Sequence, residues 1–304
     1  MNKTISPPYL QAGDTIAIVA TARFITPDIL LPVIKTINSW GLKVYLHPEL
    51  YAQENQFAGS DETRVRVLQD LLHNTTVKAI LCARGGYGTT RIIDKLDFTH
   101  FKKAPKWIIG FSDVTALHVR LNHLGIQSLH SIMPILFENI GAEKSTLSLK
   151  STLLKDFHDF NVLPHEYNRT GTATAELIGG NLSMLAHLMG TPDEIETKGK
   201  ILFIEDLDEY LYHIDRMMTQ LKRGGKINQL AGLIVGHFSD MKDNLVPFGK
   251  NALQIIADQA KEFDFPVCFG FPVGHAFDNM TLVCGAEYKL AVTAQGSHLS
   301  LVSA

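Results

Sequence analysis

Residues 15–46 read TIAIVATARFITPDILLPVIKTINSWGLKVYL, and this stretch decides the fold class. It opens with a short apolar run rich in β-branched side chains (15–20), continues as an amphipathic stretch (28–40) and ends in a second apolar run (42–46). Short β-branched runs are typical of strands, and apolar residues at helical spacing are typical of helices. The stretch therefore predicts strand, helix and strand, the unit from which parallel sheets are built.

The same alternation continues through the first half of the chain. Strands are expected at 77–81 and 107–109, and helices at 62–72, 89–96 and 113–123. Such alternation is typical of a parallel sheet covered by helices on both faces, so the N-terminal half is predicted to be a Rossmann-like α/β domain. Because chemistry gathers at the carboxyl ends of parallel strands, the turns after these strands are the first places to look for a site.

The second half of the chain has a different pattern. Residues 139–168 are polar and weakly periodic, which predicts a linker between an N-terminal domain at 1–138 and a C-terminal domain at 169–304. A length of 304 residues agrees with two domains. The C-terminal domain is expected to be β-rich, with one convincing helix at 210–221. Its strands are expected at 171–178, 200–204, 232–236, 266–269, 281–284, 288–293 and 298–302.

Composition and charge exclude several classes of protein. Apolar residues make up 45% of the chain and charged residues 19%, which fits a globular protein and excludes a disordered one. A formal net charge of −3 without a basic run argues against nucleic acid or an anionic membrane as partner. The cysteines Cys82, Cys268 and Cys284 are odd in number and widely spaced, which predicts neither a disulfide framework nor a zinc site. Because no leader pattern and no membrane-length apolar run is found, a cytoplasmic location is expected.

A serine stands directly between a predicted strand and a predicted helix in residues 109–115, IGFSDVT. This is the place of the serine in a nucleophile elbow, where the hydroxyl stands above the sheet edge and the helix N-terminus offers N–H groups to an oxyanion. Ser112 is therefore a candidate nucleophile. The alternative is that Ser112 or Asp113 only caps the following helix, which is the commoner role of these residue types.

Two further strand ends carry candidate residues. Residues 82–88, CARGGYG, form a glycine-rich turn that either brings N–H groups close to an anion or simply requires positive φ angles. Residues 204–209, IEDLDE, hold four carboxylates, most of which fit the start of a helix. Glu205 differs from the others because it follows the apolar run directly and should project from the strand end. No nearby residues have metal-ligand spacing, so no metal is expected.

One histidine has a strongly loop-like setting. His275 lies in a Gly/Pro-rich turn between two predicted strands, where rigid neighbours suit a general base. His130 and His237 lie near other strand ends and are alternative candidates. His118 and His123 are five residues apart on one predicted helix and so face different ways, which argues against a shared metal.

Taken together, these segments resemble the LD-carboxypeptidase family of serine peptidases, which also contains the microcin C self-immunity peptidases. The resemblance rests on the order of several segments along the chain: 16–20, 57–64, 84–88, 110–113, 179–182, 204–206 and 274–275. Two segments depart from the common family pattern. Residues 20–22 read ATA where Ala-Pro-Ser is common, and residues 130–133 read HSIM where His-Gly-Pro-Met is common. These departures are expected to alter a substrate subsite.

The resemblance implies an α/β domain that carries a nucleophile, a β-rich domain that carries the rest of a catalytic triad, and an active site in the cleft between them. The serine, glutamate and histidine of the family match Ser112, Glu205 and His275. Glu209 is the rival for the middle position, but Glu205 follows the apolar strand and precedes an aspartate, as the family's glutamate does. No cofactor is implied.

The resemblance also implies an activity: hydrolysis of the L,D-peptide bond before the terminal D-alanine of murein tetrapeptides, in cell-wall recycling. The N–H groups of Asp113 and Gly86 would donate hydrogen bonds to the oxyanion. Arg84 and Gly85 would bind the carboxylate of the substrate. A homodimer is expected on the same ground. Two alternatives stay open. One is a microcin-immunity-type peptidase acting on peptide–nucleotide conjugates, and the other is a non-catalytic α/β protein that binds a small ligand at the glycine turn.

Overall fold

The computed structural model describes residues 4–303, which form two compact units. The first unit extends to Phe157 and also includes the short segment Met280–Val283. The second unit comprises His158–Asn279 and the chain from Cys284 onward. The chain therefore returns to the first unit for a few residues late in its course.

The segment expected to be a linker, 139–168, is largely structured. Helix α4 (Glu143–Leu153) buries Leu149 and Leu153 within the first unit, and strand β6 (Phe160–Val162) belongs to the sheet of the second. The helix was missed because its buried face is only half apolar: Ser145 and Thr152 are buried beside the two leucines. The two units divide between Phe157 and His158, which lies inside the segment expected to be a linker.

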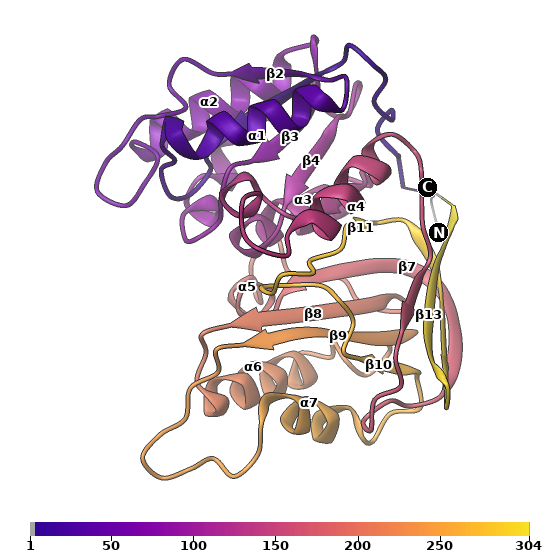
Figure 1. Ribbon diagram of the computed structural model, residues 1–304. Coiled ribbons are helices and arrows are strands. Elements are labelled where there is room, and N and C mark those ends of the chain that lie inside the picture. The colour runs from indigo at the N-terminus through magenta and orange to yellow at the C-terminus, as the bar shows by residue number, and fades with distance from the viewer. Residues whose placement is uncertain (1–3, 304) are drawn as a thin grey trace. The chain divides into compact units, whose positions relative to one another are not determined.

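The first unit is built on a six-stranded sheet with the order β11-β5-β4-β3-β1-β2 (Figure 1). Its strands are β1 (Thr15–Val19), β2 (Lys43–Leu46), β3 (Val77–Cys82), β4 (Trp107–Gly110), β5 (Ser128–His130) and β11 (Leu282–Cys284). β1 to β5 pair in parallel, which confirms the predicted Rossmann-like sheet. The chain passes from β1 to β2 on one side and to β3 on the other, and ligands of parallel sheets bind at the carboxyl ends of strands at such a switch point.

Helices and short 3-10 turns connect these strands. They are α1 (Pro27–Ser39), α2 (Asp61–His73), α3 (Thr115–His123), η1 (Thr89–Arg91), η2 (Ile93–Lys95), η3 (Ser112–Val114) and η4 (Pro134–Leu136), together with α4. α1 begins at a proline, and the hydroxyl of Ser60 accepts a hydrogen bond from Thr63 N at 3.2 Å to cap α2. The helix expected at 89–96 is the pair η1 and η2, because so short a segment gains little from helical propagation.

The second unit contains a mixed seven-stranded sheet with the order β10-β9-β8-β7-β12-β13-β6. β7 to β10 pair in parallel, and the remaining strands pair antiparallel. Besides β6, its strands are β7 (Gly171–Asn181), β8 (Ile201–Leu207), β9 (Gly232–Ser239), β10 (Val267–Phe269), β12 (Glu287–Thr293) and β13 (Gly296–Ser303). The predicted β-rich character is confirmed. The expected strand at 281–284, however, is β11, which pairs into the first sheet.

Three helices accompany this second sheet: α5 (Leu182–His187), α6 (Leu211–Arg223) and α7 (Ala252–Ala260). α6 is the predicted helix, and it buries one apolar stripe that includes Ile214, Met217 and Leu221. Figure 1 shows α6 and α7 beside β8 and β9. α7 was not predicted, although the reciprocal side-chain bonds of Asn251 and Gln254 form a capping box that the sequence also contains.

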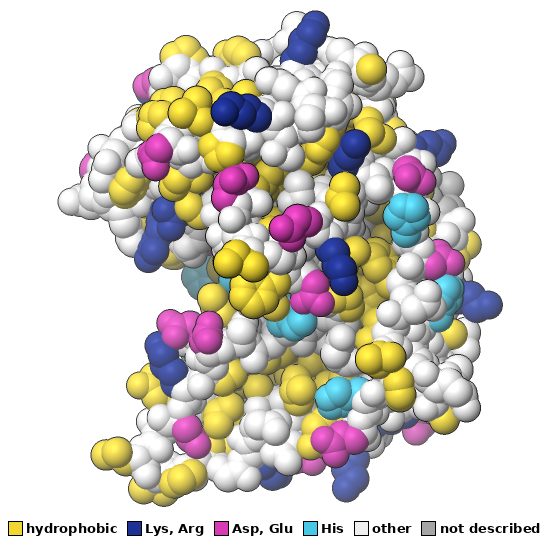
Figure 2. All heavy atoms as spheres, in the orientation of Figure 1, with side chains coloured by type: hydrophobic (Ala, Val, Ile, Leu, Met, Phe, Trp, Pro, Cys, Tyr) yellow, Lys and Arg dark blue, Asp and Glu magenta, His cyan; other side chains and the backbone are white. Residues whose placement is uncertain are grey.

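Two further features of the described residues are the length of the helices and the distribution of charged side chains on one face. None of the helices within residues 4–303 is long and apolar enough to cross a membrane. On the face drawn in Figure 2, Lys and Arg side chains are interspersed with Asp and Glu side chains. No large single-sign patch of the kind that attracts polyanions is visible on that face.

Candidate functional site

Ser112 occupies a strained turn at the carboxyl end of β4. Its φ angle is 63°, in the left-handed region, where a side chain costs about 1–2 kcal/mol. Neither η3 nor α3 has a side-chain cap, so the alternative that Ser112 or Asp113 serves as a helix cap is wrong. Backbone strain of this kind concentrates at functional sites, because the surrounding structure must hold it in place. The turn has the conformation expected of a nucleophile elbow.

The glycine-rich turn after β3 lies directly against Ser112. A Cβ atom built on Gly85 would lie 3.0 Å from Ser112 Oγ and 3.5 Å from Asp113 N, so only glycine leaves this space open. Gly86 has a φ of 112°, which glycine adopts without strain. Among the described residues, neither Gly86 N nor Asp113 N donates to a backbone carbonyl. Both N–H groups therefore remain available near the serine hydroxyl.

A buried arginine anchors this turn. Arg64 on α2 is 1% exposed and donates from Nη1 to the carbonyl oxygens of Thr21 and Gly88, each at 2.8 Å. Arg64 also forms an ion pair with Asp61. The guanidinium thus ties the end of β1 to the glycine turn after β3. Sequence reasoning included Arg64 in the resembling segment 57–64 but assigned it no role, because only the fold shows where its side chain is buried.

Asp113 and His118 make hydrogen bonds to residues at and after the ends of β3, β4 and β5. The Asp113 carboxylate accepts the N–H of Thr89 at 2.8 Å, and burial raises the pKa of Asp113 although this bond opposes the rise. His118 Nε2 lies 2.9 Å from Gly110 O and its Nδ1 lies 2.8 Å from Ser128 Oγ. Burial lowers the pKa of His118 to about 4, which keeps the imidazole neutral. His118 is therefore a structural histidine.

In the second unit, Glu205 and His275 form a hydrogen-bonded pair. His275 Nδ1 lies 2.6 Å from Glu205 Oε2. The Glu205 side chain is completely buried, and its second oxygen, Oε1, has no hydrogen-bond partner among the described residues. The sequence predicted that Glu205 projects from a strand end. Instead β8 continues to Leu207, and the register against β9 shifts between Ile204 and Asp206, so Glu205 lies at an irregularity inside the sheet.

The two carboxylates at this position shape the protonation of His275. Burial disfavours the imidazolium, but the charge and hydrogen bond of Glu205 outweigh it and Asp206 adds to them, so the pKa of His275 is raised. Burial, with the Glu205 charge adding to it, raises the pKa of Asp206 to about 6. Asp206 accepts hydrogen bonds from Ser183 Oγ at 2.8 Å and from Asn181 Nδ2 at 2.9 Å, which limit that rise.

A close backbone approach holds the histidine turn against Glu205. Gly274 has a φ of 117°, and a Cβ atom built on it would lie 2.7 Å from Glu205 Oε2. Gly274 N donates to Asn279 Oδ1 at 3.0 Å, and Ser239 Oγ donates to the carbonyl oxygen of His275 at 2.6 Å. Gly274 stands beside the predicted histidine in the sequence, but its contact with Glu205 joins residues 69 positions apart.

The rival residues from the sequence have other partners. Glu209 Oε2 lies 2.5 Å from His213 Nδ1, and Glu209 Oε1 accepts a hydrogen bond from Ser183 Oγ at 3.1 Å. His237 Nε2 lies 2.9 Å from Asp278 Oδ1, on the surface of the second unit. His130 is fully buried in the first unit. Glu205 is therefore the carboxylate that orients His275.

The structure brings the predicted site residues together in two groups. The group in the first unit contains Ser112, Asp113, Arg84, Gly85 and Gly86, and the group in the second unit contains Glu205 and His275. Each group is assembled from turns that follow or interrupt parallel strands. The first group offers a hydroxyl, two N–H donors and a cation, and the second group offers an imidazole with its carboxylate, all of them kinds of group that serine hydrolases use.

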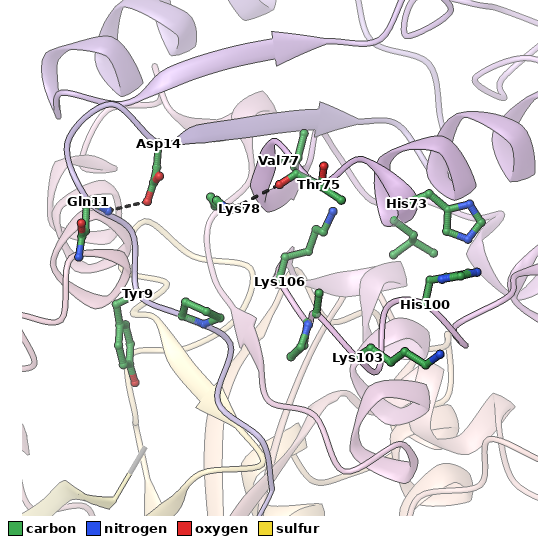
Figure 3. A pocket seen from close by; sticks show the side chains of 14 residues that line it. Tyr9, Gln11, Asp14, His73, Thr75, Val77, Lys78, His100, Lys103 and Lys106 are labelled. Atoms are coloured by element: carbon green, nitrogen blue, oxygen red, sulfur yellow. Dashed lines mark hydrogen bonds between the residues drawn. The ribbon is translucent and has the colours of Figure 1, made fainter.

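A pocket of about 930 Å³ lies at the other edge of the first sheet, near the amino ends of β1, β3 and β4 (Figure 3). Its lining includes Lys78, Lys103 and Lys106. The Lys106 amine donates to Leu71 O at 2.9 Å and to Asn74 O at 2.6 Å, at the C-terminal end of α2. A cation there satisfies the last carbonyls of the helix, so Lys106 has a structural role.

Comparison with known proteins identifies the family. Residues 16–131 match the LD-carboxypeptidase N-terminal domain, and residues 174–290 match the LD-carboxypeptidase C-terminal domain. The chain is 36% identical to the "Probable murein peptide carboxypeptidase" of Bacillus subtilis, covering 92% of this chain and 90% of that protein. It is 27% identical to the "Murein tetrapeptide carboxypeptidase" of Pseudomonas aeruginosa, covering 87% and 89% respectively.

Solved structures show the same fold. The crystal structure of muramoyltetrapeptide carboxypeptidase from Oxalobacter formigenes is similar with a TM-score of 0.86 and 30% identity, covering 94% of this chain and 97% of that one. The microcin C7 self-immunity protein MccF shares the fold with a TM-score of 0.85 at 18% identity, covering 96% and 97%. The domain matches, the sequence identity and the fold agree, and this chain belongs to the LD-carboxypeptidase family of peptidases.

Proposed function

We propose that this protein is a serine carboxypeptidase that hydrolyses the L,D-peptide bond before the terminal D-alanine of murein tetrapeptides. The observation that carries the proposal is the hydrogen bond between His275 and the buried Glu205, because it prepares an imidazole to act as a general base. The strained turn at Ser112 supports the assignment of the nucleophile. The names of the relatives from P. aeruginosa and O. formigenes support a murein tetrapeptide as substrate.

In the proposed reaction, Ser112 Oγ attacks the carbonyl carbon of the L-configured centre that precedes D-alanine. His275 takes the proton of the hydroxyl, and Glu205 orients the imidazole and stabilises its charged form. The carbonyl oxygen becomes an oxyanion that accepts hydrogen bonds from the N–H groups of Asp113 and Gly86. Each such donor contributes roughly 3 kcal/mol to transition-state stabilisation in oxyanion holes that have been measured.

The tetrahedral intermediate then collapses. The bond between the carbonyl carbon and the nitrogen of D-alanine breaks, and His275 returns the proton to the leaving amine. The acyl-serine that remains is hydrolysed by water, which His275 deprotonates in turn, and Ser112 recovers its proton. Arg84 and the N–H of Gly85 bind the C-terminal carboxylate of the substrate, since a guanidinium and a backbone N–H are strong partners for that group.

The test is D-alanine release from a murein tetrapeptide by the purified protein and by its Ser112→Ala variant. A pentapeptide and an all-L tetrapeptide serve as substrate controls. We expect release by the wild type only, and only from the L,D bond. Equal release by both proteins would remove Ser112 from the mechanism, and no release by a folded wild type would contradict the murein assignment.

The cytoplasmic location expected from the sequence and the homodimer implied by the family resemblance remain predictions. Light scattering of the purified protein distinguishes a homodimer from a monomer. Fractionation of the source cells distinguishes a cytoplasmic protein from an exported one.

A further inference from the structure

Two arginines without carboxylate partners flank the turn beside Ser112. Among the described residues, Arg64 and Arg91 both pair with Asp61, whereas neither Arg23 nor Arg84 forms an ion pair with a carboxylate. Within residues 4–303, the Arg84 side chain donates one long hydrogen bond, of 3.3 Å, to the carbonyl oxygen of Phe24. The first unit therefore compensates one pair of arginines in this region and leaves the other pair uncompensated.

The side chain of Arg23 lies over the glycine turn. A Cβ atom built on Gly86 would lie 2.8 Å from Arg23 Cγ and Cδ and 3.0 Å from its Nε. The preceding glycine, Gly85, makes the corresponding approach to Ser112 Oγ. Because neighbouring Cα atoms are only about 3.8 Å apart, the Arg23 side chain and the serine hydroxyl flank the same short piece of backbone.

The backbone around Arg23 is held firmly. Ala58 N donates to Ala22 O at 3.0 Å and Phe24 N donates to Gln56 O at 3.2 Å, so the loop after β1 is bridged on both sides of Arg23. The exposed Arg23 side chain thus projects from an anchored segment. Sequence analysis noted that residues 20–22 depart from the common family pattern, but it did not consider the arginine that follows them.

Two neighbouring cations repel one another unless an anion joins them. Burial lowers the pKa of Arg84, and the charge of Arg23 contributes to the decrease. A carboxylate placed between two guanidinium groups removes this repulsion and accepts charge-assisted hydrogen bonds from both. The position beside Ser112 suits the carboxylate nearest to the scissile bond.

Building on the proposed function, we propose that Arg23 and Arg84 together bind the C-terminal carboxylate of the peptide and thereby restrict the enzyme to substrates with a free C-terminus. Arg23 is the specificity residue that this proposal adds to Arg84. The carboxylate is engaged before and during the reaction, so removal of Arg23 raises KM more than it lowers kcat.

The test compares a tetrapeptide ending in D-alanine with the same peptide ending in D-alaninamide. Affinities are measured by calorimetry on the Ser112→Ala variant, with and without Arg23→Gln, because this background binds peptide without turning it over. We expect Arg23→Gln to weaken binding of the acid by about 10- to 100-fold and binding of the amide by less than about threefold. Arg23→Lys should restore part of the loss. In the active enzyme, kcat/KM for the acid should fall by a similar factor.

Arg223→Gln is the matched control, since Arg223 is an exposed arginine at the end of α6 in the second unit. It should leave both affinities unchanged, and thermal unfolding should confirm that all variants are folded. An unchanged preference for the acid in Arg23→Gln, or equal weakening of acid and amide, would overturn the assignment.

Peptides with lysine or diaminopimelate as the third residue distinguish the C-terminal carboxylate from a side-chain carboxylate. A loss confined to the diaminopimelate peptide would place Arg23 at the side chain and contradict the C-terminal role. D-alanine release by enzymes that keep Ser112 distinguishes failure of the proposed function from failure of the role proposed for Arg23. If the wild type releases D-alanine and Arg23→Gln keeps its acid preference, only the role of Arg23 fails. If the wild type releases none, the proposed function fails and this role fails with it.

Discussion

His275 Nδ1 lies 2.6 Å from Oε2 of Glu205, a carboxylate that is completely buried in the sheet of the second unit. An ionised carboxylate only accepts hydrogen bonds, so this contact places the proton on Nδ1 and the lone pair of the imidazole on Nε2. The same contact stabilises the imidazolium that forms when His275 takes a proton. One hydrogen bond therefore sets both the tautomer and the basicity of the proposed catalytic histidine.

Glu205→Gln should reduce kcat on the order of 10³-fold or more, because the amide neither fixes the tautomer nor stabilises the imidazolium. The acidic limb of the pH profile of kcat/KM should also move to lower pH, since Glu205 holds the pKa of His275 above its ordinary value. Steady-state rates between pH 5 and 9 check both effects. An acidic limb that stays in place would show that Glu205 does not govern the titration of His275.

The same pair should make folding stability depend on pH. Because the pKa of His275 is raised in the folded state, the stabilisation is fully present below the pKa of the unfolded histidine, about 6.5, and is lost as pH rises through the folded value. Denaturant unfolding at several pH values should show this decline in the wild type. Glu205→Gln should flatten it, and an equally steep decline in the variant would assign the effect to other groups.

Replacement of Ser112 by glycine should stabilise the protein relative to replacement by alanine. Both variants lack the hydroxyl, but only alanine keeps a side chain at the φ angle of 63°. Ser112→Gly should therefore be more stable by about 1 kcal/mol, as measured by urea unfolding. Ser151, inside α4, provides the control. At that helical position glycine should be less stable than alanine, and the same order at Ser112 would mean that the turn carries no strain.

Arg64→Met should lower both stability and activity. The substitution leaves the buried carbonyl oxygens of Thr21 and Gly88 without their donor, which should cost about 2 to 4 kcal/mol in unfolding free energy. The glycine turn also loses its anchor, so kcat should fall at temperatures well below Tm. Arg66→Met on the same helix removes an exposed pair with Glu49 and should cost less than about 1 kcal/mol with normal activity. Equal effects of the two substitutions would contradict the anchoring role.

Gly274→Ala should inactivate the enzyme without removing any group of the proposed triad. The new methyl group would meet Glu205 Oε2 at 2.7 Å and displace the carboxylate from His275. Gly270→Ala is the control, because Gly270 also has a positive φ angle, 72°, but a Cβ there meets only His165 Cδ2, at 3.8 Å. Both variants should lose about 1 kcal/mol of stability to backbone strain, and only Gly274→Ala should lose activity. Rate and melting measurements on the two variants distinguish strain from displacement.

The local pattern of the sequence was sufficient to predict much of the secondary structure of the first unit. The strand, helix and strand of residues 15–46 were predicted because their periodicity is a property of neighbouring residues, and Ser112 was found because it stands between two such elements. The predictions failed where the local pattern is short or weak. α4 and α7 have short apolar faces, and residues 89–96 are too few to show whether they form an α-helix or two 3-10 turns.

The sequence by itself determined the alternation that builds the parallel sheet, the place of Ser112 at a strand end, and the family to which Glu205 and His275 could be matched. Only the tertiary structure decided that β11 joins the first sheet, that Glu205 and not Glu209 faces His275, and that Arg23 lies over Gly86. The physical reason is the separation along the chain of the residues that interact. Periodicity and turn residues act over a few positions, whereas pairing, burial and close approach depend on contacts between residues far apart in the chain.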